Sequence, residues 1–110
     1  MCIFCSISDG SIPADVIAGD ERVMAFRDIS PVAPSHIVVI PRDHHPNIVE
    51  LTQADPELAG HLMSFVARVA TQENINGFRV VFNTGDDGGQ TVEHVHAHIL
   101  GGRSLQWPPG

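Results

Sequence analysis

The chain has 110 residues and a mass of 11.9 kDa, the size of a single folded domain spanning 1–110. Hydrophobic residues make up 43% and charged residues 17%, which excludes a disordered chain, a coiled coil and a repeat array. Six scattered arginines against 13 acidic residues give a net charge of −7, so we expect neither nucleic acid nor a membrane as a partner. The start of the chain lacks a signal-peptide pattern, and we expect a cytoplasmic protein.

Two strands are predicted in the first half of the chain, at 22–28 and 35–40, because apolar residues alternate in the first and β-branched residues fill the second. Pro31 and Pro34 mark the turn between them. The stretch 55–73 is predicted to be the one long helix, with Asp55 as N-cap and Pro56 at its first position. Its apolar residues recur at helical spacing and form one stripe: Leu58, Leu62, Phe65, Val66, Val69 and Ala70.

Two further strands are predicted in the second half, at 78–83 and 93–101, with a glycine-rich loop at 85–89 between them. A single long helix with several strands close together in the chain is typical of an α+β domain with an antiparallel sheet.

Three histidines alternate along the last predicted strand. Side chains alternate between the two faces of a strand, so His94, His96 and His98 are predicted to share one face. Exposed strands favour Thr, Lys and Glu, which argues against a merely solvated face. Two interpretations compete, namely a three-histidine metal site and a site with a nucleophilic histidine. The loop at 85–91, rich in glycine, precedes this strand and is a candidate phosphate cradle because its backbone N–H groups can approach an anion.

Cys2 and Cys5 form a C-x-x-C pair at the beginning of the chain. A disulfide between them would close almost no loop, so a stabilising disulfide framework is excluded. The pair is therefore interpreted as half of a metal site or as a redox pair.

The run HVHAHILGGR at 94–103 resembles the signature of the histidine triad family, His-x-His-x-His followed by apolar residues. The segment 28–41 and the loop at 88–90 resemble the same family. The tail Trp107-Pro108-Pro109-Gly110 is similar to that of its nucleotide-binding branch, whose members are purine nucleoside phosphoramidases. The resemblance implies the histidine-triad fold, with the sheet extended across a homodimer. It also implies a hydrolase that cleaves the P–N bond of purine nucleoside 5′-phosphoramidates, with AMP, GMP and their amidates as ligands.

The resemblance further implies a role for each matching residue. His96 is expected to be the nucleophile that forms a transient nucleotidyl-histidine, His98 to contact the phosphate and His36 to orient the triad. Asp28 is expected to hold the ribose hydroxyls and Ile29 to pack on the purine. The other nucleotide-binding residues that it implies are Asn83, Gly89, Gln90, Thr91 and Trp107, the last reaching toward the partner subunit's site.

A structural zinc is also implied, because related proteins hold one with an N-terminal C-x-x-C, an upstream histidine and the first triad histidine. The matching residues are Cys2, Cys5, His44 and His94, with His45 as a rival to His44. No metal is then required for catalysis.

Other functions stay open at this point. The family includes dinucleoside polyphosphate hydrolases and nucleotidyl transferases, although the tail at 107–110 argues against both. A non-catalytic purine nucleotide sensor would bind nucleotide tightly without turnover. A catalytic metal at His94, His96 and His98 would make activity sensitive to chelators. The leaving amine and the preference between adenine and guanine are not predicted.

Overall fold

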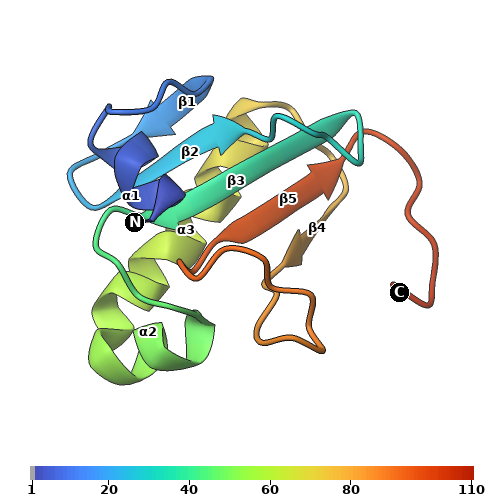
Figure 1. The fold of residues 1–110 in the computed structure, drawn as a ribbon. Helices are drawn as coiled ribbons and strands as arrows, with labels where there is room; N and C mark the ends of the chain where they lie inside the picture. The colour runs from blue at the N-terminus through green and yellow to red at the C-terminus, as the bar shows by residue number, and fades with distance from the viewer. Residues whose placement is uncertain (1) are drawn as a thin grey trace.

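The computed structural model describes residues 2–110 and shows a five-stranded antiparallel sheet with helices on both faces (Figure 1). The predicted α+β class is confirmed. Across the sheet the strands follow the order β1 (Val16–Gly19), β2 (Val23–Arg27), β3 (Ser35–Pro41), β5 (Ala97–Gly101) and β4 (Phe78–Val81). The helices are α1 (Ile3–Ser8), α2 (Ile48–Ala54) and α3 (Pro56–Gln72).

Helix α3 is the predicted long helix and covers one face of the sheet. The Asp55 side chain caps it by accepting a hydrogen bond from the Leu58 backbone N–H at 3.0 Å, and Pro56 opens it. The whole predicted apolar stripe is buried. It packs against the side chains of Val23, Ala25, Ile37, Val39, Ala97 and Ile99 on the sheet. Within residues 2–110 no helix has the length and apolar character needed to cross a membrane.

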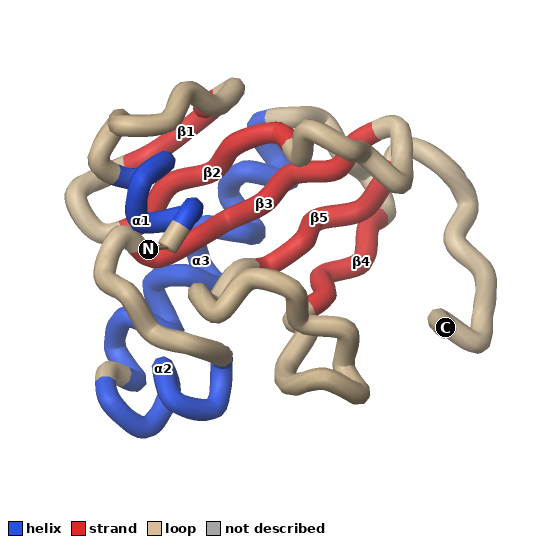
Figure 2. Tube along the Cα trace, viewed as in Figure 1, coloured by secondary structure: helices blue, strands red, loops and turns tan. Residues whose placement is uncertain are grey.

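The opposite face of the sheet carries a smaller apolar cluster of Met24, Phe26, Val38 and Ile40, which helix α1 covers with Phe4 and Ile7. Figure 2 shows α1 in front of the sheet and α3 behind it. Because side chains alternate along a strand, His36 on β3 and His98 on β5 point to the α1 face. One face of the sheet therefore carries the main core, and the other carries both the smaller apolar cluster and the side chains of His36 and His98.

Three elements were not predicted: α1, β1 and α2. Each has only four to seven residues, too few for a hydrophobic period to stand out. Helices this short owe their stability to tertiary packing rather than to their own propensity.

The predicted strand 93–101 is wrong in its first four residues, because β5 begins at Ala97. The Val95 N–H donates to the His45 carbonyl at 2.7 Å, so the chain there pairs with a loop instead of with β3. His94 and His96 therefore precede the strand, and the prediction that the three histidines share one strand face fails. The bend sends His94 away from the other two.

Candidate active site and metal centre

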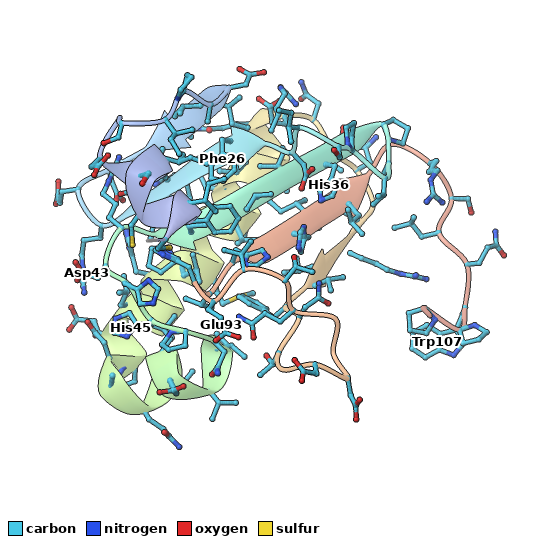
Figure 3. The ribbon with its side chains drawn as sticks, viewed as in Figure 1. Phe26, His36, Asp43, His45, Glu93 and Trp107 are labelled. Carbon is cyan, nitrogen blue, oxygen red and sulfur yellow. The ribbon has the colours of Figure 1, made fainter. Side chains whose placement is uncertain are left out.

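Three histidines from two neighbouring strands and the approach to β5 form one cluster. Val38 on β3 pairs with His98 on β5, which brings His36 and His98 within a hydrogen bond, Nε2 to Nδ1, of 2.8 Å. The His96 and His98 ring centroids are 4.9 Å apart. His36 and His96 are buried, at 7% and 6% exposed. Figure 3 shows His36 on β3.

Hydrogen bonds to the backbone determine where the ring protons lie. The Val32 N–H donates to His36 Nδ1 at 3.1 Å, so a neutral His36 carries its proton on Nε2 and donates it to His98 Nδ1. His98 then holds its proton on Nε2. The His94 carbonyl at 2.7 Å can only accept, so His96 donates from Nδ1 and keeps the lone pair on Nε2. The cluster thus presents one nucleophilic nitrogen and one ring donor.

Burial keeps the His96 and His98 rings neutral. It lowers the pKa of His96 below the usual histidine range, although the hydrogen bond to the His94 carbonyl opposes the shift. Burial, together with the neighbouring His96 and His36, lowers the pKa of His98 to about 4. Both imidazoles are therefore uncharged near neutral pH, as a nitrogen nucleophile requires.

An apolar cleft of about 480 Å³ opens beside the cluster, between α1 and the start of the sheet. This size is typical of a small-molecule site. Phe4 joins the cleft to the cluster, because its ring lies edge-on to His96 at a centroid distance of 4.9 Å. The cleft is lined by Ile3, Phe4, Ile7, Ile12, Pro13, Ala14, Asp15, Phe26, Arg27, Asp28, Ile29 and Val38.

Asp28 and Ile29 lie at the rim of this cleft, where the resemblance implied a ribose and a purine contact. The Asp28 carboxylate is 3.4 Å from His36 Nε2, so it stands between cleft and cluster. Ile29 is 97% exposed. Asn83 does not line this cleft. It lines a separate, smaller cavity of about 240 Å³ together with His36 and His98.

The glycine-rich loop is braced by Gln90. Its side-chain amide donates to the Pro46 and Val92 carbonyls and accepts from the Gly85 N–H, so the side chain is engaged within the loop. Gly88 allows a close approach of the backbone, since a Cβ there would lie 2.3 Å from the Thr84 carbonyl oxygen. The contacts of Gly89, Gln90 and Thr91 with a phosphate remain predictions. The structure adds that the Gln90 side chain braces the loop.

A second cluster, of two cysteines and two histidines, can hold a metal ion. The donor atoms of Cys2, Cys5, His44 and His94 all lie within 4.8 Å of one another. His94 Nδ1 is 3.3 Å from Cys2 Sγ and 3.6 Å from Cys5 Sγ, and His44 Nδ1 is 3.4 Å from Cys5 Sγ. A tetrahedral zinc would place its sulfur and nitrogen ligands about 3.5 Å apart.

The surroundings of His94 also suit a metal ligand. The ring is fully buried and donates from Nε2 to the Pro41 carbonyl at 2.8 Å, which leaves the Nδ1 lone pair facing the sulfurs. Burial lowers the pKa of His94, which keeps the ring neutral. Burial and the adjacent Cys2 raise the pKa of the Cys5 thiol, so a cation must displace its proton on binding.

The structure separates the histidines that the sequence treated as one group. His94 turns to the cysteines, so His94, His96 and His98 do not converge on one point among the described residues. Asp28, His36 and His98 do converge. However, the Val32 N–H occupies His36 Nδ1 and places the proton on the nitrogen that would face an ion. This geometry favours a hydrogen-bonded chain there over a metal site.

Two further predicted residues are placed by the structure. His44 belongs to the cluster of residues that could hold a metal ion and His45 does not, so the geometry favours His44 over its rival. Trp107 lies far out on the C-terminal extension, 81% exposed, with the Arg79 guanidinium of β4 at 5.9 Å from its ring (Figure 3).

Sequence reasoning missed most of the cleft. Its apolar walls come from α1 and β2, above all Phe4, Ile7 and Phe26. The available signals were the spacing of three between Phe4 and Ile7 and the alternation of Met24 with Phe26. Both segments are short and neither pattern names a ligand, so neither stood out from ordinary core packing.

Comparisons with known proteins agree with this fold. A family model described as the HIT domain matches residues 9–105. An uncharacterized HIT-like protein of Synechococcus elongatus is 50% identical over 98% of this chain and 96% of its own length. A HIT family hydrolase of Legionella pneumophila has a TM-score of 0.95 at 43% identity, with both chains fully covered. A histidine triad nucleotide-binding protein of Candida albicans has a TM-score of 0.82 at 26% identity, covering 98% of this chain and 83% of that one.

Proposed function

The chain belongs to the HIT domain family, and we propose that it is a purine nucleoside 5′-phosphoramidase with His96 as its nucleophile. The observation that carries this proposal is the 2.7 Å hydrogen bond between His96 Nδ1 and the His94 carbonyl. His96 Nδ1 donates to this carbonyl, so the Nε2 lone pair remains for attack. The ring next to it, His98, offers an N–H to the developing charge on phosphorus-bound oxygen.

The reaction then proceeds in two displacements at one phosphorus atom. The amidate nitrogen takes up a proton from solvent, His96 Nε2 forms a bond to phosphorus while the P–N bond breaks, and the neutral amine leaves. Water next attacks the same phosphorus, releases a proton to solvent, breaks the bond between phosphorus and His96 and sets free the nucleoside monophosphate. Dividing one difficult step into two suits a neutral imidazole, which is both a nucleophile and a leaving group near pH 7.

The nucleoside is proposed to occupy the apolar cleft beside α1. Phe4, Phe26 and Ile29 offer flat or apolar surface to a purine ring, and Asp28 offers a carboxylate to the ribose hydroxyls. Asn83 and Thr91 are proposed to contact the phosphate, together with the backbone of Gly89 and Gln90.

Turnover of adenosine phosphoramidate tests the assignment. We expect His96→Ala to lower kcat by at least about a thousandfold while AMP binding persists. The matched control is His61→Ala, because His61 lies on α3, paired with Asp20, and should keep wild-type turnover. A folded wild type that binds AMP but leaves the amidate intact contradicts the phosphoramidase assignment. Loss of kcat at saturating amidate on chelation, in a protein that stays folded, contradicts a metal-independent nucleophile.

The Cys2, Cys5, His44 and His94 cluster is proposed to hold a structural zinc. Two thiolates and two imidazoles form a closed set of four ligands with no position left for a substrate. When bound, the ion joins the start of the chain to the loop before α2 and to the approach to β5. Structural zinc in small domains contributes about 10 kcal/mol of binding free energy to folding.

Metal analysis of purified variants tests the zinc site. We expect about one zinc per chain in the wild type, and loss of that zinc in Cys5→Ser and in His44→Gln. His45→Gln is the matched control, because His45 neighbours the cluster without joining it. Zinc-free wild type, or a zinc content that depends on His45 and not on His44, contradicts this assignment.

We also propose that the chain forms a homodimer in which two sheets join. Strand β4 is one outer strand of the sheet, and Phe78 on it is 41% exposed. Trp107 stands next to that strand, against Arg79, and is proposed to complete the nucleotide site of the partner subunit. Light scattering of the purified protein tests this, and a monomer at micromolar concentration contradicts it.

A further inference from the structure

Helix α1 belongs to both sites at once. Cys2 caps the helix and Cys5 lies within it, and both are candidate metal ligands. Ile3, Phe4 and Ile7 of the same helix line the apolar cleft. The helix and its capping residue Cys2 therefore form a wall of the nucleotide cleft and supply two of the four candidate metal ligands.

Phe4 connects the two sites most directly. It lies between the two cysteines in sequence, and its ring is edge-on to three other rings. The centroid distances are 4.9 Å to His96, 5.6 Å to Phe26 and 5.9 Å to His94. Its neighbours are thus the proposed nucleophile, the cleft wall and a metal ligand. A shift of α1 moves the ring away from all three together.

The helix has few other attachments to the sheet. A helix of six residues is not stable alone in water. Its remaining anchors include the packing of Phe4 and Ile7 on the α1 face of the sheet, a hydrogen bond from the Arg42 guanidinium to the Ser8 carbonyl at 3.1 Å, and one from the Ile12 N–H to the Ser6 carbonyl at 3.1 Å. Both polar anchors hold the C-terminal half. Its N-terminal half is attached by the packing of Phe4 and, through Cys2 and Cys5, by the candidate metal cluster.

We propose that metal binding at the Cys2, Cys5, His44 and His94 cluster and nucleotide binding in the α1 cleft are coupled, and that Phe4 transmits the coupling. Because the cleft is assigned to a nucleotide, this inference rests on the proposed function. With the ion bound, α1 lies in the position that closes the cleft and holds the His96 ring. Without the ion, the N-terminal half of α1 samples other positions. A nucleotide that binds must first return the helix to the closed position, and this lowers its affinity.

Coupling of this kind is reciprocal, which gives a test that does not depend on turnover. If zinc tightens AMP binding by some factor, AMP must tighten zinc binding by the same factor. Coupling free energies between sites commonly correspond to factors of about 5 to 150. We expect a factor of at least about five for this pair, because the cleft loses one wall when α1 moves.

The experiment measures the zinc affinity of the wild-type protein by competition with a chelator, with and without saturating AMP. A matching titration measures AMP affinity in zinc-loaded and zinc-free protein by calorimetry. The expected result is the same factor, about fivefold or more, in both titrations. Equal zinc affinities with and without AMP overturn the proposal.

Two variants on the same helix isolate the role of Phe4. Phe4→Leu keeps an apolar side chain but removes the ring, and we expect the factor to fall to about one while zinc still binds. Ile7→Ala is the matched control, because Ile7 lines the same cleft about one helical turn after Phe4 and is not a candidate metal ligand. It should weaken AMP binding in both metal states and leave the factor unchanged. A wild-type factor in Phe4→Leu overturns the role of Phe4.

The outcomes also separate this inference from the proposed function. AMP binding that depends on zinc, without any amidate turnover, contradicts the phosphoramidase and leaves the coupling intact. Normal turnover with AMP affinity independent of zinc contradicts the coupling alone. If the zinc-free protein unfolds, the chelator competition still measures the factor by which AMP tightens zinc binding. An undiminished factor in Phe4→Leu would then show that the coupling comes from global folding, and it would overturn the proposal.

Discussion

The His98 ring makes the stability of this protein sensitive to pH on the acidic side of neutrality. Its pKa is about 4 in the folded chain and 6.5 in the reference state, because burial and the His96 and His36 rings disfavour a charge there. Below pH 6.5 the unfolded chain takes up a proton that the folded chain does not. The free energy of unfolding therefore falls as the pH drops from about 6.5 to about 4.

The size of the effect follows from the two pKa values. Lowering the pH from about 7.5 to about 5 reduces the free energy of unfolding by about 2 kcal/mol through the His98 ring alone. That is a large share of the stability of a small domain, which is about 5–15 kcal/mol. Burial also lowers the pKa of His96, so the whole protein should lose more than this amount.

Urea denaturation of the wild type and of His98→Gln at the two pH values isolates the ring. Glutamine does not titrate, and its side-chain oxygen can accept the hydrogen bond from His36 Nε2. We expect the variant to lose about 2 kcal/mol less than the wild type between about pH 7.5 and about pH 5. An equal loss in both proteins would refute the argument that His98 is held neutral by its surroundings.

Three further predictions concern the framework around the site. Leu62→Ala removes a fully buried side chain from the α3 stripe and should cost about 2–5 kcal/mol in urea denaturation, with zinc content unchanged. Gly60→Ala, at an exposed helical position with no atom near the new Cβ, should raise the free energy of unfolding by about 0.5–1 kcal/mol, and a destabilised variant would contradict this. Gly88→Ala places its Cβ against the Thr84 carbonyl, so hydrogen exchange at the loop amides of Gly85 and Gln90 should speed up more than exchange within α3.

Local chemistry in the sequence was sufficient for the main framework. The N-cap at Asp55, the proline after it and a stripe of six apolar residues predicted α3, and all of the stripe is buried. The β-branched run at 35–40 became the central strand β3, flanked by β2 and β5. These elements are long or strongly patterned, so propensity and burial favour the same structure. The triad motif likewise pointed to the HIT family, which the family model confirms.

The site itself was decided by contacts between distant segments. A period-two pattern placed His94, His96 and His98 on one strand face, but the hydrogen bond from Val95 to the His45 carbonyl ends that strand early. His94 then meets Cys2 and Cys5, about 90 positions earlier in the chain.

Contacts between distant segments also decided the proton positions in the histidine cluster and the walls of the cleft. The Val32 N–H and the His94 carbonyl set which ring nitrogen is a donor, and nothing in the residue types predicts either partner. Helix α1 is too short to be recognised from its own pattern, and packing on the sheet is what makes it the wall of a cleft. Residue types and the family motif thus indicated which side chains carry the chemistry, whereas the tertiary structure decided which histidine faces the cysteines and which histidines lie together, because proton position and metal ligation depend on the atoms that face each ring.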